Sequence, residues 1–204
     1  DSELSGNMID ICPVGALTSK PFRYSARTWE LSRRKSVSPH DSTGANLIVQ
    51  VKNHKVMRVV PLENEAVNEC WIADRDRFSY ESLNGPDRLT KPMLKQGGEW
   101  KEVELYLAGA LVRGVGSDNI DYRLRNAEFT ANEGVRWLGT PIASLSTLQS
   151  VLVVGSNLRK DHPLFAQRIR QATRKGGMVT TINSEVFDWA MPVAQSLIAP
   201  SQLW

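Results

Sequence analysis

Residues 149–183 alternate between a strand pattern and a helix pattern, and this stretch limits the possible folds more than any other. Positions 149–154 form a nearly continuous apolar run, which is typical of a parallel strand covered on both faces. After the loop 155–157, Asp161 is the expected N-cap of a helix that Gly176-Gly177 closes. Residues 178–183 then form a second apolar strand. The pattern predicts a parallel βαβ unit and therefore an α/β fold class.

A Cys-Pro pair near the start of the chain points to chemistry. In ferredoxin-type [4Fe-4S] sites, the last cysteine ligand usually stands in a segment like Ile11-Cys12-Pro13-Val14-Gly15-Ala16-Leu17. Proline turns the chain away, and glycine lets backbone N–H groups approach the sulfur. The chain has only 2 cysteines, so it cannot complete a four-iron cluster alone. We therefore expect it to be an interior fragment of a longer protein, with Cys12 as its one metal ligand.

The residues around Cys12 resemble one family. Residues 2–21 resemble the large iron–sulfur subunits of the proton-pumping NADH:quinone oxidoreductase, respiratory complex I. The resemblance continues through segments shared with molybdopterin oxidoreductases in general: Ala26-Arg27-Thr28-Trp29-Glu30-Leu31, Val56-Met57-Arg58-Val59, Asp87-Arg88-Leu89-Thr90-Lys91-Pro92-Met93 and Val153-Val154-Gly155-Ser156-Asn157.

This resemblance implies a function for the parent protein: relay of electrons from NADH and flavin through iron–sulfur clusters towards quinone. It implies a [4Fe-4S] cluster held in part by Cys12, no molybdopterin, and the other subunits of the peripheral arm as partners. The expected location is the cytoplasmic side of the inner membrane, with no direct membrane insertion and no nucleic acid partner. No residue of this segment carries a signal for catalysis or for binding NADH, flavin or quinone.

A second cysteine pattern is present in spacing only. Molybdopterin oxidoreductases of the formate-dehydrogenase type have Cys-x2-Cys-x3-Cys and a later fourth cysteine. The corresponding positions here fall on Ser38, Asp41 and Ala45, with Cys70 near the fourth. Iron–sulfur clusters need thiolates, so this substituted site (positions 38, 41, 45 and 70) is predicted to hold no cluster. Cys70 is then expected to be a buried small hydrophobe.

The pattern divides the chain into three parts. Residues 1–24 are the expected end of a ferredoxin-like [4Fe-4S] domain. Residues 25–97 form a small β-containing cap, with a hairpin of 47–51 and 56–60 turning at Asn53 and helix-like spacing over 65–80. Residues 98–204 form a partial, molybdopterin-oxidoreductase-like α/β domain that begins with a helix from Leu105. A family segment is missing near 103–105.

Charge and hydropathy exclude some classes of protein. The formal net charge is +3, and the run Arg33-Arg34-Lys35 is too short to indicate a nucleic-acid patch and is expected in a solvated loop. No apolar run approaches the roughly 20 residues that span a bilayer, and no signal peptide is visible. We expect a soluble, cytosol-facing piece.

Two alternatives remain open at this stage. In a catalytic molybdenum or tungsten oxidoreductase, the loop 155–157 would hold a pterin dinucleotide, with Arg159 and Lys160 meeting its phosphates. Against this, Glu185 follows the second strand and would repel phosphate. The other alternative is a purely structural module that holds no cluster.

Overall fold

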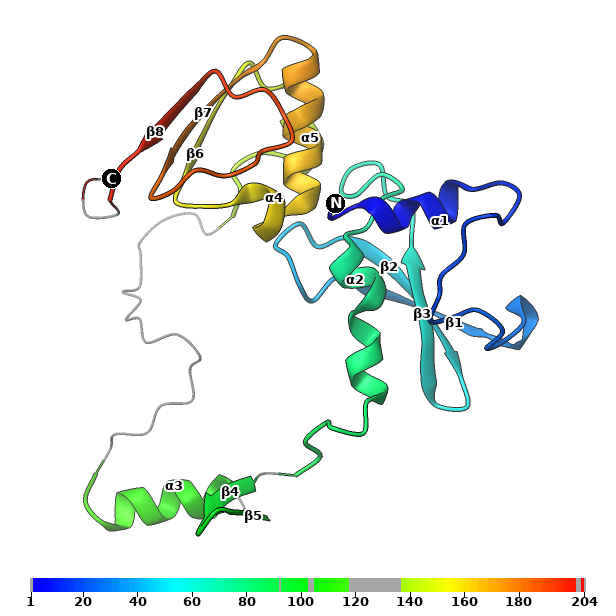
Figure 1. The fold of residues 1–204 in the computed structure, drawn as a ribbon, viewed down its shortest axis with the longest axis vertical. Coiled ribbons are helices and arrows are strands. Elements are labelled where there is room, and N and C mark those ends of the chain that lie inside the picture. Colours follow the sequence, from blue (N-terminus) through cyan, green and yellow to red (C-terminus); the bar gives the residue numbers. More distant parts are fainter. Residues whose placement is uncertain (1, 92, 103–104, 118–136, 201–202, 204) are drawn as a thin grey trace. The chain divides into compact units, whose positions relative to one another are not determined.

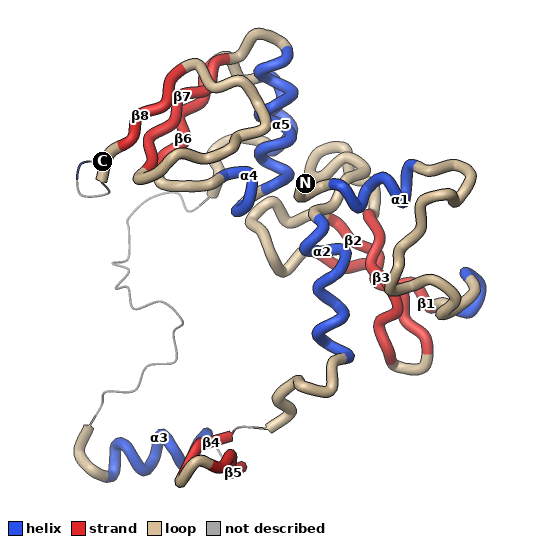
Figure 2. Tube along the Cα trace, in the orientation of Figure 1, coloured by secondary structure: helices blue, strands red, loops and turns tan. Residues whose placement is uncertain are grey.

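The computed structural model describes residues 2–91, 93–102, 105–117, 137–200 and 203. It contains two compact units, one made of residues 1–84 and 137–204 and the other of residues 85–136. Figure 2 shows that the first unit contains helices as well as two separate sheets.

The first sheet of the large unit is an antiparallel meander. Its strands are β1 (Ser32–Val37), β2 (Asn46–Lys52) and β3 (Lys55–Pro61), in the order β1-β2-β3. The predicted hairpin is thus confirmed, and Asn53 has the expected left-handed conformation, with φ of 50°. The prediction of a solvated loop for Arg33-Arg34-Lys35 was wrong: these residues lie in β1, although every residue of that strand is exposed.

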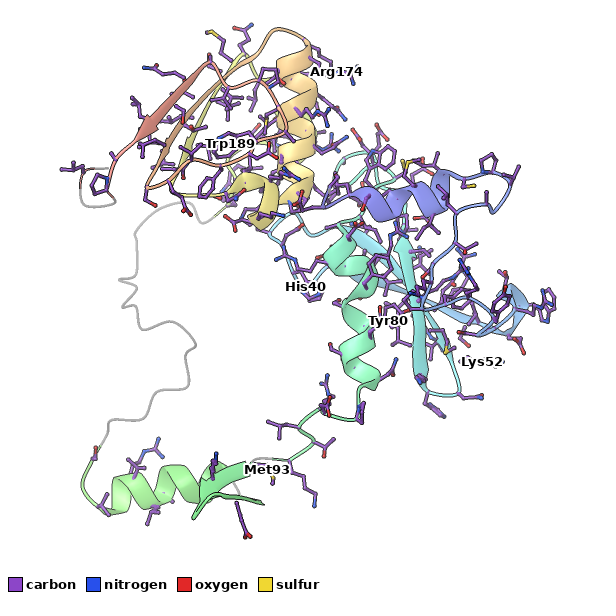
Figure 3. The ribbon with its side chains drawn as sticks, viewed as in Figure 1. His40, Lys52, Tyr80, Met93, Arg174 and Trp189 are labelled. Atoms are coloured by element: carbon purple, nitrogen blue, oxygen red, sulfur yellow. The ribbon has the colours of Figure 1, made fainter. Side chains whose placement is uncertain are left out.

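Two short helices follow this sheet and complete a small core. They are α2 (Asp74–Phe78) and the 3-10 helix η3 (Ser79–Asn84), and the core beneath them contains Leu47, Val59, Ile72 and Tyr80. Figure 3 shows Tyr80 between η3 and the sheet. The helix expected over 65–80 is only partly present, because residues 65–73 form turns and an extended stretch. Asn68 satisfies the backbone there by donating its amide N–H to the carbonyls of three neighbours: Leu62, Glu69 and Trp71.

The second sheet confirms the α/β fold class. Strands β6 (Ser150–Val154), β7 (Met178–Asn183) and β8 (Gln195–Ile198) pair in parallel in that order. Between β6 and β7 lie α4 (Leu158–Asp161) and α5 (Pro163–Arg174), and Figure 1 shows α5 lying along one face of the sheet. The βαβ unit is therefore present as predicted, and β8 extends it.

The start of the main helix differs from the prediction. Asp161 does not cap α5; it is the last residue of α4, and its carboxylate accepts a hydrogen bond from the Ser156 hydroxyl at 2.7 Å. His162 stands at the N-cap of α5 without a side-chain cap bond, and Pro163 opens the first turn. Pro163 needs no amide partner at that position, so the sequence signal for the start of α5 was the proline rather than the aspartate.

A core of mixed aliphatic and aromatic side chains joins α5 to the parallel sheet. Its buried members are Val153, Leu158, Ala166, Ile169, Val179 and Trp189. Trp189 comes from the chain between β7 and β8, and its ring contacts that of Phe187 edge-to-face at a centroid distance of 5.8 Å. The opposite face of the sheet carries exposed apolar side chains, including Leu152 and Met178.

Arg168 of α5 reaches the turn that follows the antiparallel sheet. Its side chain is 4% exposed and donates to the carbonyls of Glu65 and Val67 at 2.8–3.2 Å. A further contact reaches the hydroxyl of Ser146 in the 3-10 helix η4 (Ile142–Thr147) at 3.3 Å. Because a buried guanidinium is costly without partners, these bonds make Arg168 a fixed link between α5 and the turn after β3.

The small unit contains a hairpin and a helix. Strands β4 (Met93–Gln96) and β5 (Glu99–Glu102) form a hairpin, and α3 (Leu105–Gly114) follows. The helix expected from Leu105 is confirmed, whereas the expected discontinuity at Glu104 lies outside the described residues.

Candidate functional site

Cys12 lies at the end of a short helical segment. The 3-10 helix η1 (Ser5–Asn7) leads into α1 (Met8–Ile11), and Cys12 is the C-cap residue, with its N–H donating to the Met8 carbonyl at 3.2 Å. Its backbone is extended, with φ of −68° and ψ of 108°, so the chain leaves the helix at Pro13. Proline cannot continue the hydrogen bonding of the helix, and the sequence Cys-Pro therefore fixes the thiol at a helix end.

Backbone N–H groups after Cys12 converge on its sulfur. The N–H of Leu17 lies 3.5 Å from Sγ, and Gly15 takes the positive φ of 65° that folds the loop back. The Leu17 N–H contributes most to lowering the pKa of the Cys12 thiol. Burial is the second-largest cause and opposes it, and the N–H groups of Val14, Ala16 and Gly15 act in the same direction as Leu17. The loop therefore stabilises a thiolate, which is the form that binds iron.

The Cys12 loop fits one ligand of a cluster but not a complete site. Among the described residues no group of three or more His, Cys, Asp or Glu side chains is placed to hold a metal ion. Apolar side chains flank Cys12 and remain exposed: Met8, Ile11, Val14 and Leu17. A buried cluster needs both further thiolates and the exclusion of water, and the described residues around Cys12 supply neither.

The segment that carries Cys12 is firmly docked on the chain before and within α2. The side chain of Asn7 is 3% exposed and bonds the backbone of Ile72 twice, donating to its carbonyl at 2.8 Å and accepting from its N–H at 3.1 Å. The Gly6 N–H donates to the Asp74 carboxylate at 2.7 Å. Arg77, 4% exposed, donates to Asn7 at 3.0 Å and to Asp10 at 2.6 Å.

The substituted site has a different chemistry. The Ser38 hydroxyl donates to the buried carboxyl of Asp76 at 2.6 Å, and Asp41 accepts the N–H of Thr43 at 2.9 Å. Ala45 is fully buried and offers no ligand atom. Ser38 thus bonds to α2 and Asp41 bonds within its own loop, and all three positions lack a thiol. The donor set does not fit an iron–sulfur cluster.

Cys70 is not the buried hydrophobe that the sequence suggested. It is exposed, because residues 64–70 form a turn closed by the bridge between Asn64 and Glu69. Although the residue as a whole is exposed, local burial of its thiol raises the pKa of Cys70, and the nearby charges of Glu69, Glu63 and Glu65 act in the same direction. The two cysteines therefore differ in the sign of their pKa shifts.

The loop after β6 is where a pterin dinucleotide would meet positive charge. Arg159 pairs with Glu3 at 2.7 Å and with Asp188 at 2.5 Å, and Lys160 also pairs with Glu3. Burial alone would raise the pKa of Glu3, but the hydrogen bonds from Lys160 and Arg159 outweigh it and lower the pKa to about 2. Both cations of the loop are thus engaged by carboxylates of the same chain.

Three protein-family models match separate parts of the chain. Residues 1–18 match the family described as NADH-quinone oxidoreductase subunit 3, ferredoxin-like domain. Residues 31–81 match NADH-ubiquinone oxidoreductase NDSU1/NuoG-like, 4Fe-4S domain, and residues 103–196 match molybdopterin oxidoreductase. Cys12 lies in the first match, and the substituted site lies in the second.

Curated relatives agree with these matches. The chain is 34% identical to the G subunit of NADH-quinone oxidoreductase from Rickettsia felis over 211 residues, which takes in 87% of this chain and 31% of the relative. It is 33% identical to the NADH-ubiquinone oxidoreductase 75 kDa subunit of Reclinomonas americana, over 86% of this chain and 32% of the relative. The chain is thus similar, over 86–87% of its own length, to NuoG-like subunits of NADH-quinone oxidoreductase. It spans about a third of the length of these relatives.

These similarities agree with the resemblance first seen around Cys12. Several contacts of the site could not be predicted from the sequence. In the described part of the chain, no helix is long and apolar enough to cross a membrane. Sequence reasoning missed Arg77, which lies in an ordinary charged segment, and it missed Glu3 as the partner of Arg159. The only available signal for either was charge complementarity, which does not indicate which distant residues meet.

Proposed function

We propose that this chain is part of an electron-relaying subunit of NADH:quinone oxidoreductase, in which Cys12 is one ligand of a [4Fe-4S] cluster. When bound, the cluster supplies one-electron transfer between NADH–flavin and quinone. The observation that carries the proposal is the convergence of N–H groups on the Cys12 sulfur, within a segment that matches a ferredoxin-like family. Such N–H groups hold a thiolate and adjust the reduction potential of a bound cluster.

The remaining features belong to the same proposal. Residues 1–24 end the ferredoxin-like domain, 25–97 form the cap with the substituted site, and 98–204 form a partial molybdopterin-oxidoreductase-like domain. We place a shortened family segment near 103–105. The alignment with the Rickettsia felis subunit runs over 211 positions while taking in 87% of this 204-residue chain, so it contains gaps in this chain. The partners are the other subunits of the peripheral arm, on the cytoplasmic side of the inner membrane.

The α/β domain acts as scaffold in this proposal, without a pterin dinucleotide. Phosphate binding needs positive side chains near a helix N-terminus, and Glu3 and Asp188 occupy those of Arg159 and Lys160. Acid extraction of the purified protein, followed by fluorescence detection of oxidised pterin, tests this. We expect no pterin, and a stoichiometric yield would favour the molybdenum or tungsten enzyme instead.

The decisive experiment replaces Cys12 by Ala in the full-length subunit within the assembled enzyme. We expect the loss of one low-temperature EPR signal of a reduced [4Fe-4S] centre and the loss of electron flow to quinone. Cys70→Ala is the matched control and should leave both unchanged. An EPR spectrum of Cys12→Ala identical to that of the parent enzyme would refute the proposal.

A further inference from the structure

Arg77 is almost completely buried, yet it binds the surface segment that carries Cys12. Its guanidinium donates to the Asp10 carboxylate at 2.6 Å and to the Asn7 amide oxygen at 3.0 Å. The Arg77 side chain is 4% exposed and that of Asp10 is 30% exposed, so the ion pair is screened by water on one side only. Asp10 precedes Cys12 by two residues in the same helical segment.

The fit between this segment and α2 leaves no spare room. A methyl group added at Gly6 would lie 2.6 Å from an Asp74 carboxylate oxygen and 2.8 Å from Arg77. The Ser5 hydroxyl also donates to Asp74, at 2.7 Å. Gly6, Asn7 and Asp10 therefore all contact residues of α2, and Cys12 follows directly from this fixed segment.

We propose that Arg77 is a positioning residue for the iron–sulfur site at Cys12, an inference that rests on the function proposed above. Through Asn7 and Asp10 it fixes the helix that presents the thiolate. Through its charge it neutralises Asp10, which would otherwise place a negative charge within one helical turn of the cluster. Adding an electron makes a cluster more negative, so an unpaired Asp10 would disfavour reduction and an unpaired Arg77 would favour it.

The two charges of the pair therefore predict opposite shifts. In the full-length subunit of the assembled enzyme, Asp10→Asn should move the midpoint potential of the Cys12-dependent centre in the positive direction. Arg77→Gln should move it in the negative direction, and the double variant should return towards the parent value. Each single change should alter the reduced-to-oxidised ratio at a fixed potential by about threefold, which is roughly 28 mV for one electron.

The measurement is a redox titration of the EPR signal that Cys12→Ala abolishes. Arg34→Gln is the matched control, because Arg34 is an exposed arginine of β1. This change removes the same charge, and we expect it to leave the midpoint potential unchanged. Arg77→Lys keeps the positive charge but replaces the forked guanidinium by a single ammonium group. It should keep the midpoint potential near the parent value even where thermal stability falls. Should Arg77→Gln fail to assemble, Asp10→Asn still decides, because its side chain is partly exposed.

The outcomes separate this inference from the proposed function. If Cys12→Ala abolishes the signal while Asp10→Asn leaves the midpoint potential where Arg34→Gln leaves it, the inference about Arg77 is overturned and the function stands. Shifts of the same sign in Asp10→Asn and Arg77→Gln would also overturn it, because they would reflect altered packing rather than charge. If Cys12→Ala leaves the signal intact, the proposed function itself fails.

Discussion

The Cys12 loop and the substituted site are two turns of one chain, both matched by iron–sulfur families, with opposite local chemistry. At Cys12 the backbone supplies N–H donors to a sulfur, and the side chains nearby are apolar and exposed. The Ser38 hydroxyl instead donates to Asp76 of α2, Asp41 accepts an N–H within its own turn, and Ala45 is buried. The Cys12 turn directs backbone N–H groups at a thiol, whereas the turn without thiols bonds to α2 and within itself. In that second turn one buried oxygen of Asp41 and the hydroxyl of Thr43 have no hydrogen-bond partner among the described residues.

The largest effect should come from adding bulk at Gly6, where the segment that carries Cys12 packs against α2. Gly6→Ala places a methyl group 2.6 Å from the Asp74 carboxylate and 2.8 Å from the Arg77 side chain, so these side chains must leave their bonds to the Cys12 segment or η1 must shift. We expect a loss of about 2 kcal/mol in the free energy of unfolding. Urea denaturation measures this. Gly114→Ala is the control, because nothing lies within 4 Å of its added methyl group. Equal stability of the Gly6→Ala variant and the parent would mean that the Cys12 segment is docked loosely.

The thiols should differ in reactivity. The pKa of Cys12 is lowered by backbone N–H groups, chiefly that of Leu17, whereas local burial raises the pKa of Cys70. In the iron-free chain at neutral pH, iodoacetamide should therefore alkylate Cys12 several times faster than Cys70, because the thiolate is the reacting form. Mass spectrometry of peptides at successive times gives both rates from one sample. Faster labelling of Cys70 would contradict the contrast between the two loops.

A pH dependence should arise at the substituted site. Burial raises the pKa of Asp76 above its ordinary value of 3.8, and the charge of Asp41 adds to this against the hydrogen bond from Ser38. Below its ordinary pKa, such a carboxyl group is neutral in both the folded and the unfolded chain, so it does not affect stability. As the pH rises towards and through the raised pKa, ionisation favours the unfolded chain and the folded state loses stability. The Asp76→Asn variant should gain stability relative to the parent over that rise.

Paired urea titrations of the parent and Asp76→Asn at several pH values from about 4 to 7 check this sign. The amide keeps an oxygen to accept the Ser38 hydrogen bond, so packing is preserved. A difference in stability that does not change with pH would show that Asp76 is ionised as readily in the folded chain as in the unfolded one.

The smallest effect should follow changes at the substituted positions themselves. Cys70→Ser alters an exposed side chain, so the free energy of unfolding should change by less than about 0.5 kcal/mol. In the full-length protein, Cys70→Ser, Ser38→Ala and Asp41→Asn should also leave iron content and NADH:quinone turnover unchanged. Iron analysis provides the readout, and loss of about four irons in any of the three would show that this site still holds a cluster.

The sequence predicted those elements of the fold that depend on apolar spacing and turn residues close together in the chain. The hairpin around Asn53 and the βαβ unit of residues 150–183 follow from alternating or continuous apolar runs and their turn residues. Strand β1 escaped prediction because all of its side chains are exposed, so its residues show no alternation between two faces. The exposure of Cys70 was missed for a related reason: a tight turn at 64–69, rather than hydrophobicity, determines its surroundings.

The candidate site divides in the same way. Cys12 was predictable because Cys-Pro and the following glycine lie together in the chain. The contacts of Arg77 with Asp10 and of Arg159 with Glu3 join residues 67 and 156 positions apart, and no spacing rule connects them. Charge patterns indicate which residues can pair, but the tertiary fold selects the pairs that form.

The ion pair between Glu3 and Arg159 also orders events during synthesis. The second residue of the pair emerges 156 positions after the first, which at ribosomal elongation rates is a delay of about 8–30 s. The contact between Asp10 and Arg77 needs 67 positions and so becomes available after roughly 3–13 s. The segment bearing Cys12 thus gains its first anchor well before its second, and a nascent chain passes through an interval in which only α2 holds it.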